Sequence, residues 1–421
     1  MKMRSLKIKN IGPVFFAALD LKRLNIIIGP QSSGKSTIAK IVSFCLWLEK
    51  DILFHQSSQY IDSEFIDEQL LSYHRLNGYF NKNSKIEYES DLISLSVTGK
   101  QLDGVTIKDG MLSSAVMSKV AYIPSERNFV TIPNISSLKL ENDYLRDFLF
   151  EWLGIRSRFT KQQSLDVVNL GLKYYFDSNR GNVILLESGK EISLEQASSG
   201  IQSVIPLLVM VSYNSDWIYN HKPEISYDKN EKLQRNILSR LGINISTGEE
   251  LTEGTKKVLN ALINNPSLID DLKSMDVLAR VADLATRIAR PHHTHLIIEE
   301  PEQNLYPTTQ RDLLLLLASN MNAHCESLLL TTHSPYILST LNVLLSTSSA
   351  SKVCQNLPMP KGVTSDMLLP IEDYAAYFIG SDGHIQTIID EEVPMISGMQ
   401  LDGVSDWVDD SIAVINEKIY E

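Results

Sequence analysis

Cysteine is scarce in this chain, and the few cysteines present are scattered. Cys45, Cys325 and Cys354 are the only three among 421 residues. They are too few and too far apart for a disulfide framework or a thiolate metal site. We therefore expect the protein to work in a reducing compartment, the cytoplasm.

Long apolar runs and long heptad repeats are also missing. No apolar run approaches the roughly 18 residues that a membrane span needs, and the basic N-terminus lacks the apolar core of a signal peptide. No heptad pattern is sustained over several repeats, which argues against a long coiled-coil arm. The sequence therefore predicts a protein with no membrane partner.

Positive charge is in deficit, with 39 lysines and arginines against 51 acidic residues and a net charge of −12. A protein whose main partner is nucleic acid normally presents a basic surface to the phosphates. DNA binding along a local basic track stays open, but the composition does not favour it.

The chain does contain a glycine-bearing stretch between a strand-like segment and a helix-like segment. Residues 25–28 (NIII) have the pattern of a short buried strand, and residues 38–48 (IAKIVSFCLWL) that of a helix. The stretch between them fits G-x-x-x-x-G-K-[ST] without a mismatch and consists of Gly29, Pro30, Gln31, Ser32, Ser33, Gly34, Lys35, Ser36 and Thr37. Backbone N–H groups and the helix dipole make such a loop a phosphate site.

This phosphate loop predicts that the chain binds ATP together with Mg²⁺. Lys35 would reach the β- and γ-phosphates, and the Ser36 hydroxyl would ligate the metal. Phosphoryl transfer to water also needs a carboxylate near the metal and a group that positions the water. The rest of the chain must supply both.

Two carboxylates end a later apolar segment. Residues 295–298 (HLII) predict a buried strand, and Glu299 and Glu300 follow it. We expect Glu299 to help hold Mg²⁺ and Glu300 to orient or deprotonate the attacking water. A solvated charge pair at a strand end is the alternative, and the phosphate loop upstream makes it the weaker one.

A histidine and a serine-rich turn complete the set of candidates. His333 follows the apolar segment 327–332 (SLLLTT), where an imidazole would touch the γ-phosphate and sense hydrolysis. Ser198, Ser199 and Gly200 precede an apolar helix and offer a second anion site, with a simple helix N-cap as the alternative. Because the chain already has its own phosphate loop, we expect this turn to contact the nucleotide of another subunit.

The order of these motifs resembles the head of ABC-type ATPases. The branch in question includes SMC proteins, DNA-repair heads and the OLD-like ATPases of prokaryotic defence operons. The matching segments are 29–36 (Walker A), 122–127 (YIPSER), 197–202 (ASSGIQ, the signature), 297–302 with Leu305 and Pro307 (Walker B and D-loop) and 331–335 (TTHSP, the switch histidine). The resemblance extends from about residue 3 to residue 390.

The resemblance implies an α/β fold, a P-loop NTPase of ABC-ATPase type with a mixed sheet, an antiparallel β layer and a helical lobe. It implies a core lobe at 1–125 and 291–421, and a helical, signature-bearing lobe at 126–290 with an insertion at about 214–290. It also implies that two subunits sandwich two ATP molecules, so that each signature completes the partner's site. ATP hydrolysis in such heads is slow and regulatory.

Some residues depart from the family pattern. Glu299 stands where many ABC proteins have Asp, and Tyr306 replaces a histidine. No glutamine ends the predicted strand 119–123 (KVAYI), which leaves Glu126, Arg127 and Asn128 as candidates for its role. The run 292–295 (HHTH) has the composition of a metal cluster, but we interpret it as the start of the Walker B strand, where alternate residues face opposite sides.

Hydrophobic periodicity predicts the remaining elements. We expect antiparallel strands within 5–16 and 86–110, a mainly helical region at 131–178 and a hairpin at 182–194. A helix at about 309–321, a hairpin at 375–389 and a closing helix at about 404–420 complete the chain. Residues 344–351 (LLSTSSAS) are expected to form at most a flexible loop.

These expectations combine into a functional hypothesis. The chain is a cytoplasmic ATPase that dimerises around ATP and acts as a sensor or scaffold for a separately encoded effector, a nuclease or toxin, in a bacterial anti-phage system. The alternative is a repair-type or SMC-like ATPase that acts on nucleic acid directly. The ATP-binding half of a transporter ranks last, because its motif variants differ from those found here.

Overall fold

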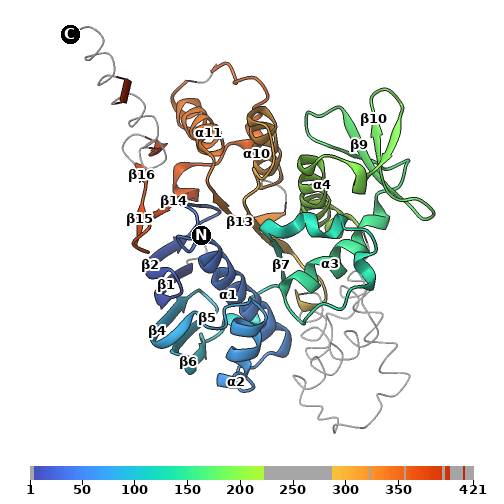
Figure 1. The fold of residues 1–421 in the computed structure, drawn as a ribbon. Helices are drawn as coiled ribbons and strands as arrows, with labels where there is room; N and C mark the ends of the chain where they lie inside the picture. The colour runs from blue at the N-terminus through green and yellow to red at the C-terminus, as the bar shows by residue number, and fades with distance from the viewer. Residues whose placement is uncertain are drawn as a thin grey trace, which may run out of the picture.

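The computed structural model describes residues 4–221, 287–321, 324–354, 357–390, 394–398 and 411–412. Most of the predicted insertion at about 214–290, and nearly all of the predicted closing helix at about 404–420, lie outside the described residues. Within the described part, the chain forms a layered core and a side lobe that carries α3 (Tyr144–Ile155) and α4 (Ser199–Ser212) (Figure 1).

The core is built on a six-stranded sheet with the order β15-β14-β3-β13-β12-β7. Five of these strands are parallel, and β15 pairs antiparallel with β14 at one edge. Their bounds are β3 (Leu24–Ile28), β7 (Ser118–Ile123), β12 (His293–Glu299), β13 (Cys325–Thr332), β14 (Tyr374–Ile379) and β15 (Ile385–Thr387). The carboxyl ends of β3, β12 and β13 therefore meet at the same edge of the sheet.

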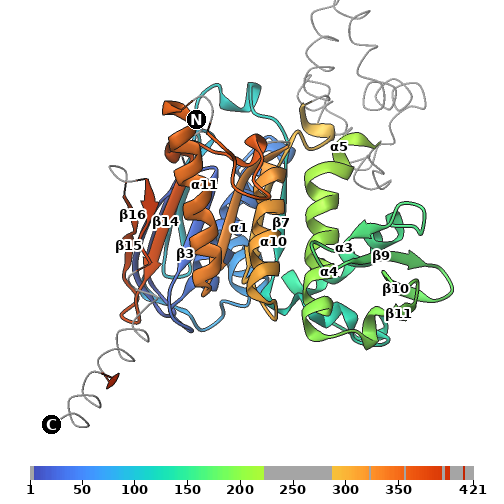
Figure 2. The same cartoon turned by 90° about the horizontal axis from the view of Figure 1, so that it is seen from above.

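Both faces of this sheet are covered, which explains why its strands are nearly continuous apolar runs. In β3, Leu24, Ile26 and Ile28 pack on the side of α10 (Pro307–Met321) and α11 (Pro335–Val353). Ile27 faces the opposite side, where α1 (Lys35–His55) lies. Figure 2 shows α10 and α11 in front of the sheet and α1 behind it.

A second sheet covers the far side of α1. It is antiparallel, with the order β2-β1-β4-β5-β6. The bounds are β1 (Arg4–Ile11), β2 (Val14–Leu21), β4 (Phe80–Glu89), β5 (Ile93–Thr98) and β6 (Gln101–Ile107), with the short helix α2 (Ser63–Ile66) before β4. Apolar side chains from β1, β4, β5 and α1 form one core, so the predicted antiparallel layer is confirmed.

The side lobe corrects one prediction. It contains α3 (Tyr144–Ile155), α4 (Ser199–Ser212), α5 (Ile218–Asn220) and the strands β8 (Leu165–Asp166), β9 (Leu172–Asp177), β10 (Gly181–Leu186) and β11 (Glu191–Ser193). The hairpin predicted at 182–194 is present, but the helix predicted over 131–178 is wrong at β9. The aromatic segment LKYYFD pairs with β10 there, because aromatic residues suit a half-buried strand.

The loop predicted at 344–351 is also wrong, because these residues continue α11. Leu341, Leu344, Leu345 and Ser348 recur at helical spacing and are buried. The Thr347 hydroxyl donates to the carbonyl of Val343 at 2.7 Å, so a residue typical of loops is accommodated by its own helix.

The remaining short strands, β16 (Ile389–Asp390) and β17 (Met395–Ile396), pair with each other near the end of the chain. The predicted fold class is confirmed in its architecture: the described chain is an α/β fold with a mixed sheet, an antiparallel β layer and helices. In the part of the chain that the structure describes, no helix is both long and apolar enough to cross a membrane.

Candidate functional site

The phosphate loop connects β3 to α1 and is packed tightly against two neighbouring segments. A Cβ atom added at Gly29 would lie 2.3 Å from the carbonyl oxygen of Ile379, and one at Gly34 would lie 2.6 Å from Val14 Cγ2. Gly34 also has a φ of 109°, which side chains rarely adopt. Both glycines are therefore required by the close approach of β14 and of the β1–β2 turn.

Lys35 lies over the loop with its ammonium group against main-chain carbonyls. Its Nζ donates to the oxygens of Gly29 at 2.9 Å and Pro30 at 2.7 Å. Burial lowers the pKa of Lys35 to about 8, although nearby carboxylates including Glu300 act in the opposite direction. The buried Ser33 hydroxyl has no hydrogen-bond partner among the described residues, so this small loop holds donors that a phosphate would satisfy.

The predicted metal residues are in contact. Ser36 Oγ donates to Glu299 Oε2 at 2.6 Å, and the Tyr122 hydroxyl donates to the other carboxylate oxygen. Burial raises the pKa of Glu299, opposed by the hydrogen bond from Ser36 and by the charge of Lys40. A hydroxyl and a carboxylate at the end of a buried strand are hard oxygen ligands, so the residues present fit Mg²⁺.

Glu300, His333 and Lys35 form a continuous polar chain across the end of the sheet. His333 Nε2 lies 3.2 Å from Glu300 Oε1, and its Nδ1 lies 3.5 Å from Lys35 Nζ. An ammonium can only donate, so we assign the proton of a neutral imidazole to Nε2, facing the carboxylate. The hydrogen bond from His333 lowers the pKa of Glu300, against the effect of partial burial.

Glu302, which belongs to the Walker B motif but was not predicted as a site residue, fixes the backbone of the histidine. Its Oε1 accepts from the Thr332 hydroxyl and from the His333 N–H, both at 2.7 Å. Its Oε2 is buried without a hydrogen-bond partner among the described residues. The third acid of the EEPE sequence was the only signal for this role.

Arg127 is fully buried and binds main-chain carbonyls rather than the loop. It lies in the 3₁₀ segment Ser125–Thr131 after β7. It donates to the carbonyls of Glu299 and Glu300, both at 2.8 Å, and to that of Ser203 in α4 at 3.1 Å. Burial lowers its pKa to about 10. Of the three candidates for the missing glutamine's role, Arg127 thus has its donors committed elsewhere, between the Walker B end and the signature helix.

The serine-rich turn stands at the start of α4 and faces outward. Ser198 and Ser199 are exposed, and Ser198 occupies the N-cap position without a side-chain capping bond. A Cβ at Gly200 would lie 2.6 Å from the carbonyl oxygen of Asn304, so the turn abuts the segment after Walker B. Among the described residues, no hydrogen bond joins Ser198 or Ser199 to the chain's own phosphate loop.

An aromatic pair beside the loop was not predicted from the sequence. Phe15 and His384 are in contact, with ring centroids 4.8 Å apart and the rings tilted by 45°, and the Phe15 N–H donates to the carbonyl of Gly383 at 2.9 Å. Phe15 is 54% exposed and follows Val14, which packs on Gly34. The two rings come from segments almost 370 residues apart in the sequence, so no local pattern could reveal them.

One family model matches part of this chain. It is described as "AAA domain, putative AbiEii toxin, Type IV TA system" and matches residues 247–339. The matched segment is less than half of the chain, and it includes Glu299, Glu300 and His333. No curated protein matches.

Solved structures with a similar fold have low sequence identity. The SMC head domain from Thermotoga maritima is 10% identical, with 81% of this chain and 92% of that chain covered and a TM-score of 0.33. A dimeric ATP-binding cassette, MJ0796, in a post-hydrolysis state bound to ADP and Pi is 10% identical (91% and 99% covered, TM-score 0.28). The recombination mediator protein RecF is 12% identical (92% and 98%, TM-score 0.27).

Proposed function

We propose that this chain binds MgATP and hydrolyses it slowly, at a site that a second copy of the chain completes. The observation that carries the proposal is the position of His333 between Lys35 and Glu300, beside the Ser36–Glu299 pair. Hydrolysis of a γ-phosphate needs a cation for the phosphates, ligands for a metal ion, and groups that position the attacking water. Residues of all three kinds lie together at the carboxyl end of the parallel strands.

The proposed roles follow from the present contacts. Lys35 exchanges its bonds to the loop carbonyls for bonds to the phosphates. Because its pKa is lowered, Glu300 stays ionised and is a weak base, so its main task is to orient water. His333 holds that carboxylate in place. Mg²⁺, held by Ser36 and Glu299, would neutralise phosphate charge.

We include a second copy because the serine-rich turn makes no hydrogen bond to the phosphate loop of its own chain among the described residues. Ser198 and Ser199 are exposed and uncapped at the start of a 14-residue helix whose N–H groups attract anions. In the proposed dimer, this turn contacts the γ-phosphate held by the partner. The lobe at 126–290 then carries the signature, and the parts at 1–125 and 291–421 carry the phosphate loop, Walker B and switch histidine.

We assign the base of ATP to the exposed face of Phe15, next to His384. Stacking on an aromatic ring is a general way to hold a nucleobase. The close packing of Gly34 against Val14 puts this ring near the start of α1, at the phosphate end of the site.

The proposed biological role is that of a sensor or scaffold which gates a separately encoded nuclease or toxin in a bacterial anti-phage system, in the cytoplasm. It rests on the OLD-like motif set, and the description of the matching family model names a toxin of a toxin–antitoxin system. Co-purification with the products of adjacent genes and a phage-plating assay test this role. The role is wrong if no neighbour binds and the cells gain no phage resistance.

The alternative function is a repair-type or SMC-like ATPase acting on nucleic acid. It predicts that duplex DNA stimulates hydrolysis with a steep salt dependence. The net charge of −12 counts against it. An ATPase rate that is the same with and without DNA removes this alternative.

Two substitutions test the hydrolysis mechanism. Lys35→Ala should abolish ATP binding, because it removes the only side chain whose ammonium lies in the loop. Glu300→Gln should bind ATP normally and hydrolyse it about 100-fold or more slowly, since it keeps the shape but loses the charge that orients water. Binding is measured by calorimetry and hydrolysis by phosphate release. Hydrolysis at the parental rate by Glu300→Gln would show that Glu300 has been given the wrong role.

A further inference from the structure

A cluster of two histidines and a glutamate lies at the amino ends of β12 and β13, whereas the phosphate loop follows the carboxyl end of β3. His293 and His295 begin β12, two residues apart and therefore on the same face, and Glu326 lies near the start of β13. One ligand atom from each of the three residues lies within 4.8 Å of the others. His293 Nε2 is in direct contact with Glu326 Oε2.

The pairing of β12 with β13 is interrupted beside the cluster. Thr294 pairs with Cys325 and His295 pairs with Ser327, so Glu326 is an extra residue in β13 without a register partner. Where two residues of one strand oppose one residue of its partner, both side chains can lie on the same face. Glu326, which contacts His293, and Ser327, which contacts His295, both lie on the face that carries the imidazoles.

The surroundings of His295 resemble those of a metal-binding histidine. Its side chain is 1% exposed, and its Nδ1 lies 2.7 Å from Ser327 Oγ. Ligand histidines are commonly oriented in this way by a hydrogen bond at the second ring nitrogen. The ring is therefore held in place by the same strand that supplies the carboxylate.

Charged side chains lie beside the cluster. Arg4 lies between two acids, 3.2 Å from Glu49 and 3.1 Å from Glu326. All three side chains are less than a quarter exposed. Glu326 is thus a carboxylate in a poorly solvated place, where a neighbouring cation keeps it ionised. Arg4 supplies one such cation, and a bound divalent ion would supply another.

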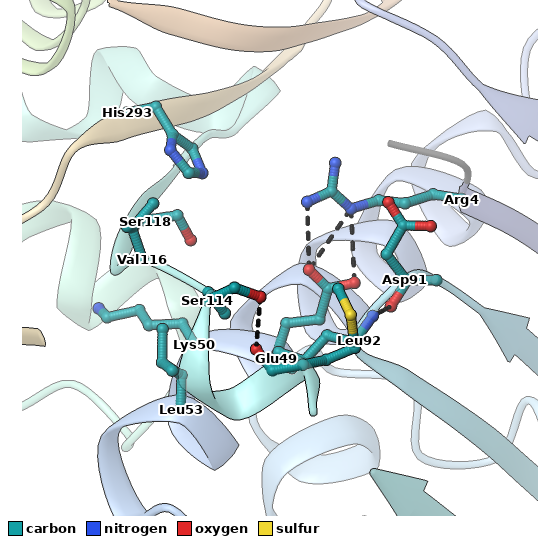
Figure 3. Close-up of a pocket in the computed structure, with 13 residues that line it drawn as sticks. Arg4, Glu49, Lys50, Leu53, Asp91, Leu92, Ser114, Val116, Ser118 and His293 are labelled. Atoms are coloured by element: carbon teal, nitrogen blue, oxygen red, sulfur yellow. Dashed lines mark hydrogen bonds and ion pairs between the residues drawn. The ribbon is translucent and has the colours of Figure 1, made fainter. Parts of the chain in front are cut away.

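A cavity gives access to the cluster. It has a volume of about 230 Å³ and is lined by Arg4, Glu49, Ser118 and His293 among others. Figure 3 shows the imidazole of His293 facing the space between Ser118 and Arg4, with Arg4 bonded to Glu49. An ion could reach the imidazole of His293 from this side without unfolding of the sheet.

We propose that His293, His295 and Glu326 form a binding site for a divalent transition-metal ion of the zinc class. Two imidazoles and one carboxylate are typical ligands of Zn²⁺ and its neighbours, whereas Mg²⁺ prefers oxygen ligands. The site is distinct from the proposed nucleotide site, and it does not depend on ATP binding. It revises our sequence-based interpretation of the run 292–295, because the strand itself puts two of its histidines on one side.

The test uses the full chain without nucleotide, after treatment with a chelator. Calorimetric titration with Zn²⁺ should show one ion bound per chain, and Co²⁺ should give the visible absorption of a nitrogen- and oxygen-ligated site. Glu326→Gln and His293→Gln should each weaken Zn²⁺ affinity by more than about tenfold. Zn²⁺ should also raise the melting temperature of the parent protein but not that of Glu326→Gln.

His292→Gln is the matched control, because it removes a histidine from the same run that is not part of the cluster. It should bind Zn²⁺ with the parental affinity. Circular dichroism checks that each variant is folded. The proposal is overturned if the parent binds no stoichiometric Zn²⁺, or if all three variants bind it equally. In either case Arg4, Glu326 and His293 form only a structural ion-pair network.

Discussion

At the residue scale, the position of Glu300 depends on an unusual backbone. Its φ is +42°, a value that non-glycine residues adopt at a cost in free energy. Two hydrogen bonds stabilise this conformation. The Glu300 N–H donates to the carbonyl of Thr331 at 2.9 Å, and Arg127 donates to the carbonyl of Glu300. In this conformation the carboxylate contacts His333, at the position where the proposed mechanism requires a water-orienting group.

Lys35 gives a pH prediction at the same scale. Its pKa of about 8 means that half of the ammonium groups are lost near that pH in the nucleotide-free protein. Bound phosphates favour the charged form and raise the pKa, so ATP binding must take up protons at and above about pH 8. ATP affinity should therefore fall as the pH rises above this value.

Calorimetry in buffers of different ionisation enthalpy measures this proton uptake. Near pH 7 the uptake should be close to zero, because Lys35 is protonated in both states. An affinity that stays constant up to about pH 10 would contradict the proposed contact between Lys35 and the phosphates.

At the element scale, Arg127 joins three pieces of the chain. It connects the end of β7, the end of β12 and the first turns of α4 through main-chain carbonyls. One side chain therefore bonds the first turns of α4 to the backbone of Glu299 and Glu300. The motif YIPSER suggested a role near the nucleotide. Its arginine, Arg127, instead bonds to the main chain of Glu299 and Glu300.

Replacing Arg127 by methionine tests this connection. The change leaves several buried carbonyls without donors, so Arg127→Met should lower the free energy of unfolding by about 3 kcal/mol or more. Urea unfolding followed by circular dichroism measures the loss. Arg290→Met, at an exposed arginine, is the control and should change stability by less than about 0.5 kcal/mol. Equal stability of the two variants would show that the buried bonds contribute little.

The elements that sequence patterns predicted best are those whose environment is uniform along their length. β3 and β12 are buried on both faces and were recognised as apolar runs. The prediction was wrong at β9, whose aromatic residues also fit a helix, and at 344–351, where serines suggest a loop. In α11 the deciding factor is packing of the leucine face against the sheet, which a local pattern does not contain.

At the scale of the whole molecule, five of the predicted site residues lie together at the carboxyl end of the parallel strands. Lys35, Ser36, Glu299, Glu300 and His333 follow strand ends, and parallel strands bring such ends together. The contact between Phe15 and His384, and that between His293 and Glu326, join segments that are distant in the sequence. Those features could not be predicted from spacing alone.

The central claim is that a second copy of the chain completes the proposed ATP site. The mass of the ATP-bound protein tests this claim most directly. Because Glu300→Gln is expected to bind ATP without rapid turnover, light scattering should show twice the monomer mass with MgATP and the monomer mass without it. Adding Ser199→Arg at the exposed signature turn should leave ATP binding intact and abolish the dimer. A Glu300→Gln protein that is saturated with MgATP and still monomeric would contradict the account.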